Sequence, residues 1–183
     1  MILYGPPASG KDTVTAALAK ADRAFVQFTR LKIGSGKTNG YRMGALSDLT
    51  GLEAAGDVIY RNERYGNVYV IDRPGLDAAF AGGVPVVHLG QIVGVQDVLA
   101  RYPADWLTVL MWCPKAVTEQ RSQGRGDTDT AKRITVWEET QADLAAHAAF
   151  RFDLTLRTDL TQPPQAARLI QATLSRRSQG PAA

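Results

Sequence analysis

A glycine-rich segment near the N-terminus has residue types and spacing that suit phosphate binding. Residues 5–13 read GPPASGKDT. A phosphate-binding loop (P-loop) needs a glycine, four further residues and then Gly-Lys, between a strand and a helix. Gly5, Gly10 and Lys11 have this spacing, with the apolar MILY before them and helix-forming residues after Thr13. Backbone N–H groups would then turn towards phosphate oxygens, and the lysine would reach the β- and γ-phosphates.

A second segment, IGSGKT at residues 33–38, looks similar but lacks this arrangement. Its position equivalent to Gly5 is Leu31, and no apolar helix follows it. We interpret it as a glycine-rich turn carrying Lys37. Two alternatives stay open: a flexible loop of no special function, or a loop whose Lys37, with Lys32 and Arg42, faces an acidic acceptor.

The P-loop departs from the usual sequence at one position. The Ser or Thr that normally follows the lysine, and whose hydroxyl binds Mg²⁺, is Asp12, and Thr13 comes next. Thr13 supplies the missing hydroxyl, or the metal is held mostly through water. Asp12 either contacts the metal's shell or favours the first turn of a helix, and we prefer the helix interpretation.

Strand and helix patterns alternate along the chain and must position this loop. Apolar runs predict strands, and amphipathic or helix-forming stretches predict helices between them. Strands are expected at 1–4, 24–29, 84–89, 106–112 and 152–156, and helices at 13–20, 73–83, 115–123, 130–148 and 163–175. This order predicts an α/β fold with a parallel sheet covered by helices. Residues 30–70 carry glycines, tyrosines and charges, which indicates a small inserted subdomain with a polar inner surface.

Composition excludes several classes of protein. The 183 residues fit one domain, and a net charge of +3 is too mild to indicate nucleic-acid binding. The single cysteine and two histidines argue against a disulfide and against a metal site of their own. We see neither an apolar run of membrane-spanning length nor a signal peptide, so we expect a cytoplasmic protein that does not bind membranes.

Several short motifs, taken in order, resemble those of guanylate kinase-like proteins, which are P-loop nucleoside monophosphate kinases. They are GPPASGKDT, FTR at 28–30, GYR at 40–42, YGN at 65–67 and RSQGRG…AKRI from 121 to 134. The Gly-Lys-Asp form is also similar to ribose 1,5-bisphosphate phosphokinases. The resemblance implies one P-loop kinase domain over 1–183, an acceptor-binding subdomain at 30–70 and an arginine-rich lid at 121–133.

The resemblance also implies roles for individual residues. ATP and Mg²⁺ would be the cofactors, and the donor would be held by the loop and by two lid arginines. These donor-binding positions are Gly5, Pro6, Pro7, Ala8, Ser9, Gly10, Lys11, Asp12, Thr13, Arg121 and Arg125, with Thr13 on the metal. Lys11, Arg125 and Arg133 would be catalytic. The acceptor would be bound by Arg30, Lys37, Tyr41, Arg42, Tyr60 and Tyr65; planar guanidinium groups suit phosphate oxygens.

Phosphoryl transfer to an anionic phosphate needs positioning and charge neutralisation rather than a strong base. The acceptor is therefore expected to be a small phosphorylated molecule, most simply a nucleoside monophosphate or modified nucleotide; a phosphosugar is the alternative. Guanine is not the expected base, because Tyr60 stands where guanylate kinases have a glutamate, and VVHLGQIVG lacks their aspartate. An inactive binding module is the alternative of another class. The assembly would be a monomer or homodimer.

Overall fold

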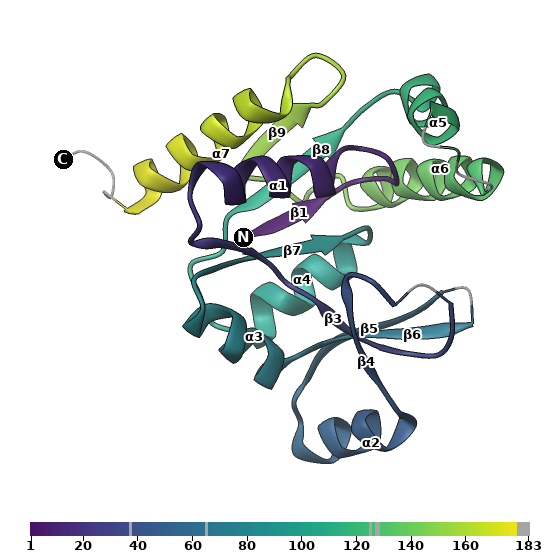
Figure 1. The fold of residues 1–183 in the computed structure, drawn as a ribbon, viewed down its shortest axis with the longest axis vertical. Helices are drawn as coiled ribbons and strands as arrows, with labels where there is room; N and C mark the ends of the chain where they lie inside the picture. Colours follow the sequence, from purple (N-terminus) through teal and green to yellow (C-terminus); the bar gives the residue numbers. More distant parts are fainter. Residues whose placement is uncertain (37, 65, 125, 127–128, 179–183) are drawn as a thin grey trace.

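A five-stranded sheet forms the centre of the molecule (Figure 1). The computed structural model describes residues 1–36, 38–64, 66–124, 126 and 129–178. The strands lie in the order β2-β7-β1-β8-β9, and every neighbouring pair is parallel. Their bounds are β1 Ile2–Tyr4, β2 Phe25–Gln27, β7 Val84–Leu89, β8 Thr108–Trp112 and β9 Leu154–Arg157.

Helices cover both faces of this sheet, as the alternating pattern predicted (Figure 1). Helices α1 (Lys11–Ala21) and α7 (Pro163–Ser178) pack on one face, and α3 (Arg73–Ala81) and α4 (Ile92–Arg101) on the other. Two further helices, α5 and α6, follow β8 and lie near the carboxyl ends of the strands. They span Lys115–Gly124 and Thr130–Ala146. The α/β fold with a parallel sheet flanked by helices is therefore confirmed.

A second, smaller sheet is inserted between β2 and α3. It has the order β4-β3-β6-β5, in which β3 and β4 run parallel and β6 is antiparallel to both its neighbours. Its strands are β3 Arg30–Ile33, β4 Tyr41–Gly44, β5 Val58–Arg64 and β6 Asn67–Asp72; α2, Leu46–Ala55, joins β4 to β5. This sheet occupies the stretch for which the sequence indicated an inserted subdomain.

Helix α4 was not expected from the sequence. Its segment IVGVQDVLAR contains a glycine and several β-branched residues, which are weak helix formers. Burial overrides this low propensity, because Ile92, Val95 and Val98 recur at helical spacing and are fully buried. Gly94 is needed for packing, since a Cβ there would lie 2.7 Å from the ring of Tyr60.

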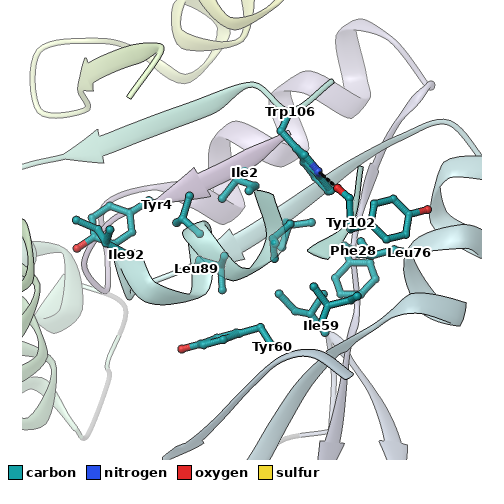
Figure 2. Packing of buried hydrophobic residues seen from close by; sticks show 14 residues of the cluster. Ile2, Tyr4, Phe28, Ile59, Tyr60, Leu76, Leu89, Ile92, Tyr102 and Trp106 are labelled. Carbon is teal, nitrogen blue, oxygen red and sulfur yellow. Dashed lines mark hydrogen bonds between the residues drawn. The ribbon is translucent and has the colours of Figure 1, made fainter. Parts of the chain in front are cut away.

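One apolar cluster joins the two sheets (Figure 2). Ile2 of the parallel sheet, Leu76 of α3, and Ile59 and Ile71 of the small sheet are all at most 1% exposed and belong to this cluster. The small sheet thus packs against the large one through α3 and α4. None of the described helices combines the length and apolar character needed to cross a membrane.

This shared core predicts a single unfolding transition for both sheets. Leu76→Ala removes a fully buried side chain between them and should lower the free energy of unfolding by about 2–5 kcal/mol. Urea titrations followed by tryptophan fluorescence and by circular dichroism should coincide. Leu160→Ala, at a side chain that is 73% exposed, is the matched control and should change stability by less than about 0.5 kcal/mol. Two separate transitions would contradict the shared core.

Candidate active site

The loop between β1 and α1 has the backbone shape that its glycines predicted. Gly5 has a φ of 157°, and a Cβ there would lie 2.2 Å from the carbonyl oxygen of Met111, so no larger residue fits. Gly10 adopts the left-handed conformation, with φ of 89°, as the N-cap of α1. Because Gly10 has no side chain to cap the helix, the N–H groups of its first turn are available to an anion.

Lys11 lies inside this loop. Its ammonium group donates to the carbonyl oxygens of Gly5 at 2.7 Å and Pro6 at 2.8 Å, and it is 3.4 Å from the hydroxyl of Ser9. Burial lowers the pKa of Lys11 to about 8, although neighbouring Asp12 acts in the opposite direction. The carbonyl dipoles of the loop therefore hold the positive charge of Lys11 at the centre of the loop. Phosphate oxygens bound there would compensate this charge for its loss of contact with water.

One cavity adjoins the loop on the side of α5 and β9. It has a volume of about 730 Å³ and is lined by the loop, by Thr13 and Arg121, and by the segment that follows β9. Arg121 donates to the carbonyl oxygens of Ala8 at 3.1 Å and Thr158 at 2.6 Å. Its guanidinium group is thereby fixed in the cavity wall, where its flat face suits stacking on an aromatic base.

A second cavity of about 320 Å³ separates the loop from the small sheet. Lys11 and Asp12 line it on the side of the loop, and Arg30, Tyr41 and Tyr60 line it on the side of the small sheet. We call this cavity the cleft. It brings together the predicted loop residues and three of the predicted acceptor-binding residues, which lie far apart in the sequence.

The wall formed by the small sheet is aromatic and cationic. Arg30 of β3 lies over the ring of Tyr69, 5.1 Å from its centroid, and the rings of Tyr41 and Tyr69 are 5.3 Å apart. Arg30 also donates to the side-chain oxygen of Asn62 at 3.5 Å. These contacts hold the arginine in the wall of the cleft, where a bound phosphate would meet it.

Strand β5 supplies residues that sequence analysis missed. Tyr60, Asn62 and Arg64 alternate along the strand, so all three face the cleft. Of these, only Tyr60 was predicted; the alternation of polar and aromatic residues was the available signal for Asn62 and Arg64. The hydroxyl of Tyr60 donates to the side-chain oxygen of Gln91, while its ring packs in the shared core; Figure 2 shows the hydroxyl at the edge of the cluster.

Contacts also cross the cleft from the small sheet to α6. Arg64 of β5 forms an ion pair with Glu139 of α6 at 2.8 Å. Arg133, at the start of α6, lines both the cleft and a cavity of about 130 Å³ formed by the loop itself. It donates to Asp129 at 2.7 Å, and this hydrogen bond lowers the pKa of the Asp129 carboxyl. Arg133 is therefore oriented next to the loop, and its catalytic role stays a prediction.

Other predicted residues lie elsewhere. Arg42 does not line the cleft: its guanidinium is bound by Asp72 and by the carbonyl oxygen of Thr29, so the acceptor role expected for it is not supported. Lys32 is buried, and its ammonium donates to the carbonyl oxygen of Ser35 at 2.6 Å. The predictions for Lys37, Tyr65 and Arg125 fall outside the described residues.

Fold and site together define a P-loop kinase. Guanylate kinase from Anaplasma phagocytophilum has a similar structure, with a TM-score of 0.65 and 16% identity over 97% of this chain and 85% of that one. Shikimate kinase from Acinetobacter baumannii, in complex with shikimate, gives a TM-score of 0.49 and 16% identity, covering 96% of this chain and 92% of that one. No curated protein matches the sequence. A family model matches residues 54–175, and the chain belongs to this family, described as chloramphenicol phosphotransferase-like protein.

Proposed function

We propose that this protein transfers the γ-phosphoryl group of ATP to the phosphate of a small acceptor bound in the cleft. One observation carries the proposal: the phosphate-binding loop opens onto a cleft whose opposite wall presents Arg30 among tyrosines. Positive charge thus lies on both sides of the space where a phosphoryl group would pass. Such an arrangement neutralises the charge of donor and acceptor phosphates together.

The residues present fit ATP and Mg²⁺. The cavity beside Arg121 would take the nucleoside, the N–H groups of the loop and Lys11 would hold the phosphates, and Arg133 would reach the group being transferred. Asp12 and Thr13 both line the loop cavity, and their oxygens are the hard donors that Mg²⁺ prefers. When bound, Mg²⁺ would offset the negative charge of the donor phosphates.

The protein's own part in the reaction is positioning and charge stabilisation. Arg30, fixed by Asn62 and Tyr69, would orient the acceptor phosphate, and Lys11 and Arg133 would stabilise charge on the equatorial oxygens of the transferred group. The pair Arg64–Glu139 spans the cleft and would help exclude water, which limits hydrolysis of ATP. An acceptor phosphate is already anionic, so no proton has to be removed from it.

The name of the family suggests an alcohol acceptor as a second candidate. Phosphorylation of an alcohol needs a general base within hydrogen-bond reach. Among the described residues that line the cleft, the carboxylates are Asp12 and Asp129, and Asp129 is bound to Arg133. Asp12 is thus the available base for an alcohol. The cationic wall around Arg30 favours a phosphorylated acceptor instead, either a nucleoside monophosphate or a phosphosugar.

Replacing the loop lysine tests whether the protein is an enzyme or an inactive binding module. Lys11→Met should reduce phosphoryl transfer by at least about 100-fold, because a charge near the transferred group is lost. Thermal melting should show that the fold is retained. Lys20→Met, at an exposed position in the last turn of the same helix, is the matched control and should keep normal turnover. Near-normal turnover of Lys11→Met would remove the central claim.

Two arginines on opposite sides of the cleft should have different kinetic effects. Arg30→Ala should raise the acceptor KM by about 10- to 100-fold, since it binds a phosphate that stays on the acceptor. Arg133→Ala should mainly lower kcat, by about 100-fold or more, because its charge is needed most in the transition state. Arg168→Ala, at an exposed position on α7, controls for loss of surface charge. Identical kinetic effects of the first two variants would show that the division of roles is wrong.

The acceptor wall predicts that GMP is not the best acceptor. Among the described residues that line the cleft, both carboxylates lie on the donor side, and Tyr60 and Gln91 bind each other. The N1–H and amino group of guanine would thus lack the acceptors that make such recognition selective by about 10⁴-fold or more. Steady-state assays should compare GMP with dGMP, AMP, CMP, UMP, dTMP, ribose 1,5-bisphosphate and chloramphenicol. A clear preference for GMP would contradict this prediction, and a preference for chloramphenicol would establish the alcohol acceptor.

A further inference from the structure

Asp12 places a carboxylate where a P-loop usually has a neutral hydroxyl. Its side chain is 83% exposed and lines both the cleft and the loop cavity, together with Lys11 and Arg133. Thr13, the next residue, lines the cavity beside Arg121 and the loop cavity, but not the cleft. The carboxylate therefore lies where the loop cavity meets the cleft, whereas Thr13 lies on the side of the loop that faces Arg121.

His88 holds Asp12 in this position. It sits near the end of β7, beside the loop, with its Nδ1 atom 3.4 Å from Oδ1 of Asp12 and its Nε2 atom 2.8 Å from the hydroxyl of Thr15. In the tautomer that carries its proton on Nδ1, His88 donates to Asp12 and accepts from Thr15, so all three groups are satisfied. Histidine–carboxylate contacts of this kind orient the ligands of metal ions.

The negative charge of Asp12 makes the free energy of nucleotide binding less favourable when no metal is present. A carboxylate about 4 Å from another unit negative charge is repelled by about 1 kcal/mol in water, and by more in a cavity. Lys11 does not remove this conflict alone, because the triphosphate brings several negative charges. A divalent cation between the carboxylate and the phosphates would turn the repulsion into attraction. The described residues contain no group of three or more His, Cys, Asp or Glu placed to hold a metal, so phosphates and water would complete its coordination.

We propose that Asp12, oriented by His88, binds the divalent cation directly and makes nucleotide binding depend on that cation. This inference rests on the proposed function, because it takes ATP as the ligand of the loop. It differs from the usual arrangement, in which a neutral hydroxyl contacts the metal and does not oppose the metal-free nucleotide. It also differs from a purely structural role at the first turn of α1, which would affect stability alone.

Calorimetric titration with ATP, in excess Mg²⁺ and in EDTA, tests the dependence. Asp12→Ala and Asp12→Asn should bind ATP about 10-fold more weakly than the wild type in Mg²⁺. In EDTA the same variants should bind ATP about 5-fold more tightly, because one unit of repulsion is gone. Glu63→Gln, an exposed carboxylate on the face of β5 that points away from the cleft, should match the wild type in both conditions.

Binding of Mn²⁺ without nucleotide, followed by electron paramagnetic resonance, provides a second measurement. The wild type should take up one Mn²⁺ weakly, Asp12→Asn should lose this binding, and His88→Gln should weaken it by about 10-fold. Thermal melts of each variant show whether the fold is intact. Asp12 variants that change ATP affinity in the same direction in Mg²⁺ and in EDTA, or that keep normal Mn²⁺ affinity, would overturn the inference. If the wild type binds no ATP in either condition, the proposed function fails, and the Mn²⁺ measurement alone decides the role of Asp12.

Discussion

The close approach of Gly5 to the carbonyl oxygen of Met111 is the contact on which the rest of the site depends. It lets the chain leave β1 against the neighbouring strand β8 and turn back to start α1 within a few residues. The carbonyl groups of Gly5 and Pro6 then point at the ammonium group of Lys11. A side chain at position 5 would push the loop away from β8 and remove these dipoles. The loop is thus shaped by the sheet before any ligand is bound.

The shared core gives this loop a fixed partner across the cleft. Because Ile59 and Ile71 of the small sheet pack in the same cluster as Ile2 and Leu76, the wall that carries Arg30 is anchored to the core that also carries β1. Polar contacts from Arg64 to Glu139 and from Tyr60 to Gln91 orient the side chains that line the cleft. Apolar burial therefore sets the width of the cleft, and the polar contacts set which side chains face it. Phosphoryl transfer depends on such positioning, since a loss of alignment of about 1 Å can reduce the rate strongly.

The parts predicted well from the sequence are those that local rules determine. The spacing of Gly5, Gly10 and Lys11 fixes the loop, and the apolar runs fix the parallel sheet. Arg42 shows where such rules stop: Asp72, 30 residues away, binds its guanidinium at the start of α3, and only the tertiary structure brings them together. Helix α4 was missed because its stability comes from burial against Tyr60 and the sheet, whereas its residues have low helix propensity. Asn62 and Arg64 could have been found from the alternation along β5, once that segment had been recognised as a strand.

The carboxylates that line the cleft lie on one of its two sides, whereas cationic side chains lie on both. The small sheet contributes Arg30 and Arg64 to the lining, while the carboxylates of the described lining residues, Asp12 and Asp129, lie on the donor side. Each of these two carboxylates contacts a nitrogen-containing side chain, Asp12 with His88 and Asp129 with Arg133. An anionic acceptor would thus meet mainly positive charge on its own side. On the donor side, Lys11 and Arg133 line the cleft together with these carboxylates, so positive charge is present there as well. Cationic side chains on both walls suit the proposed transfer of a phosphoryl group between two anionic ligands, because each ligand would be attracted to its own wall.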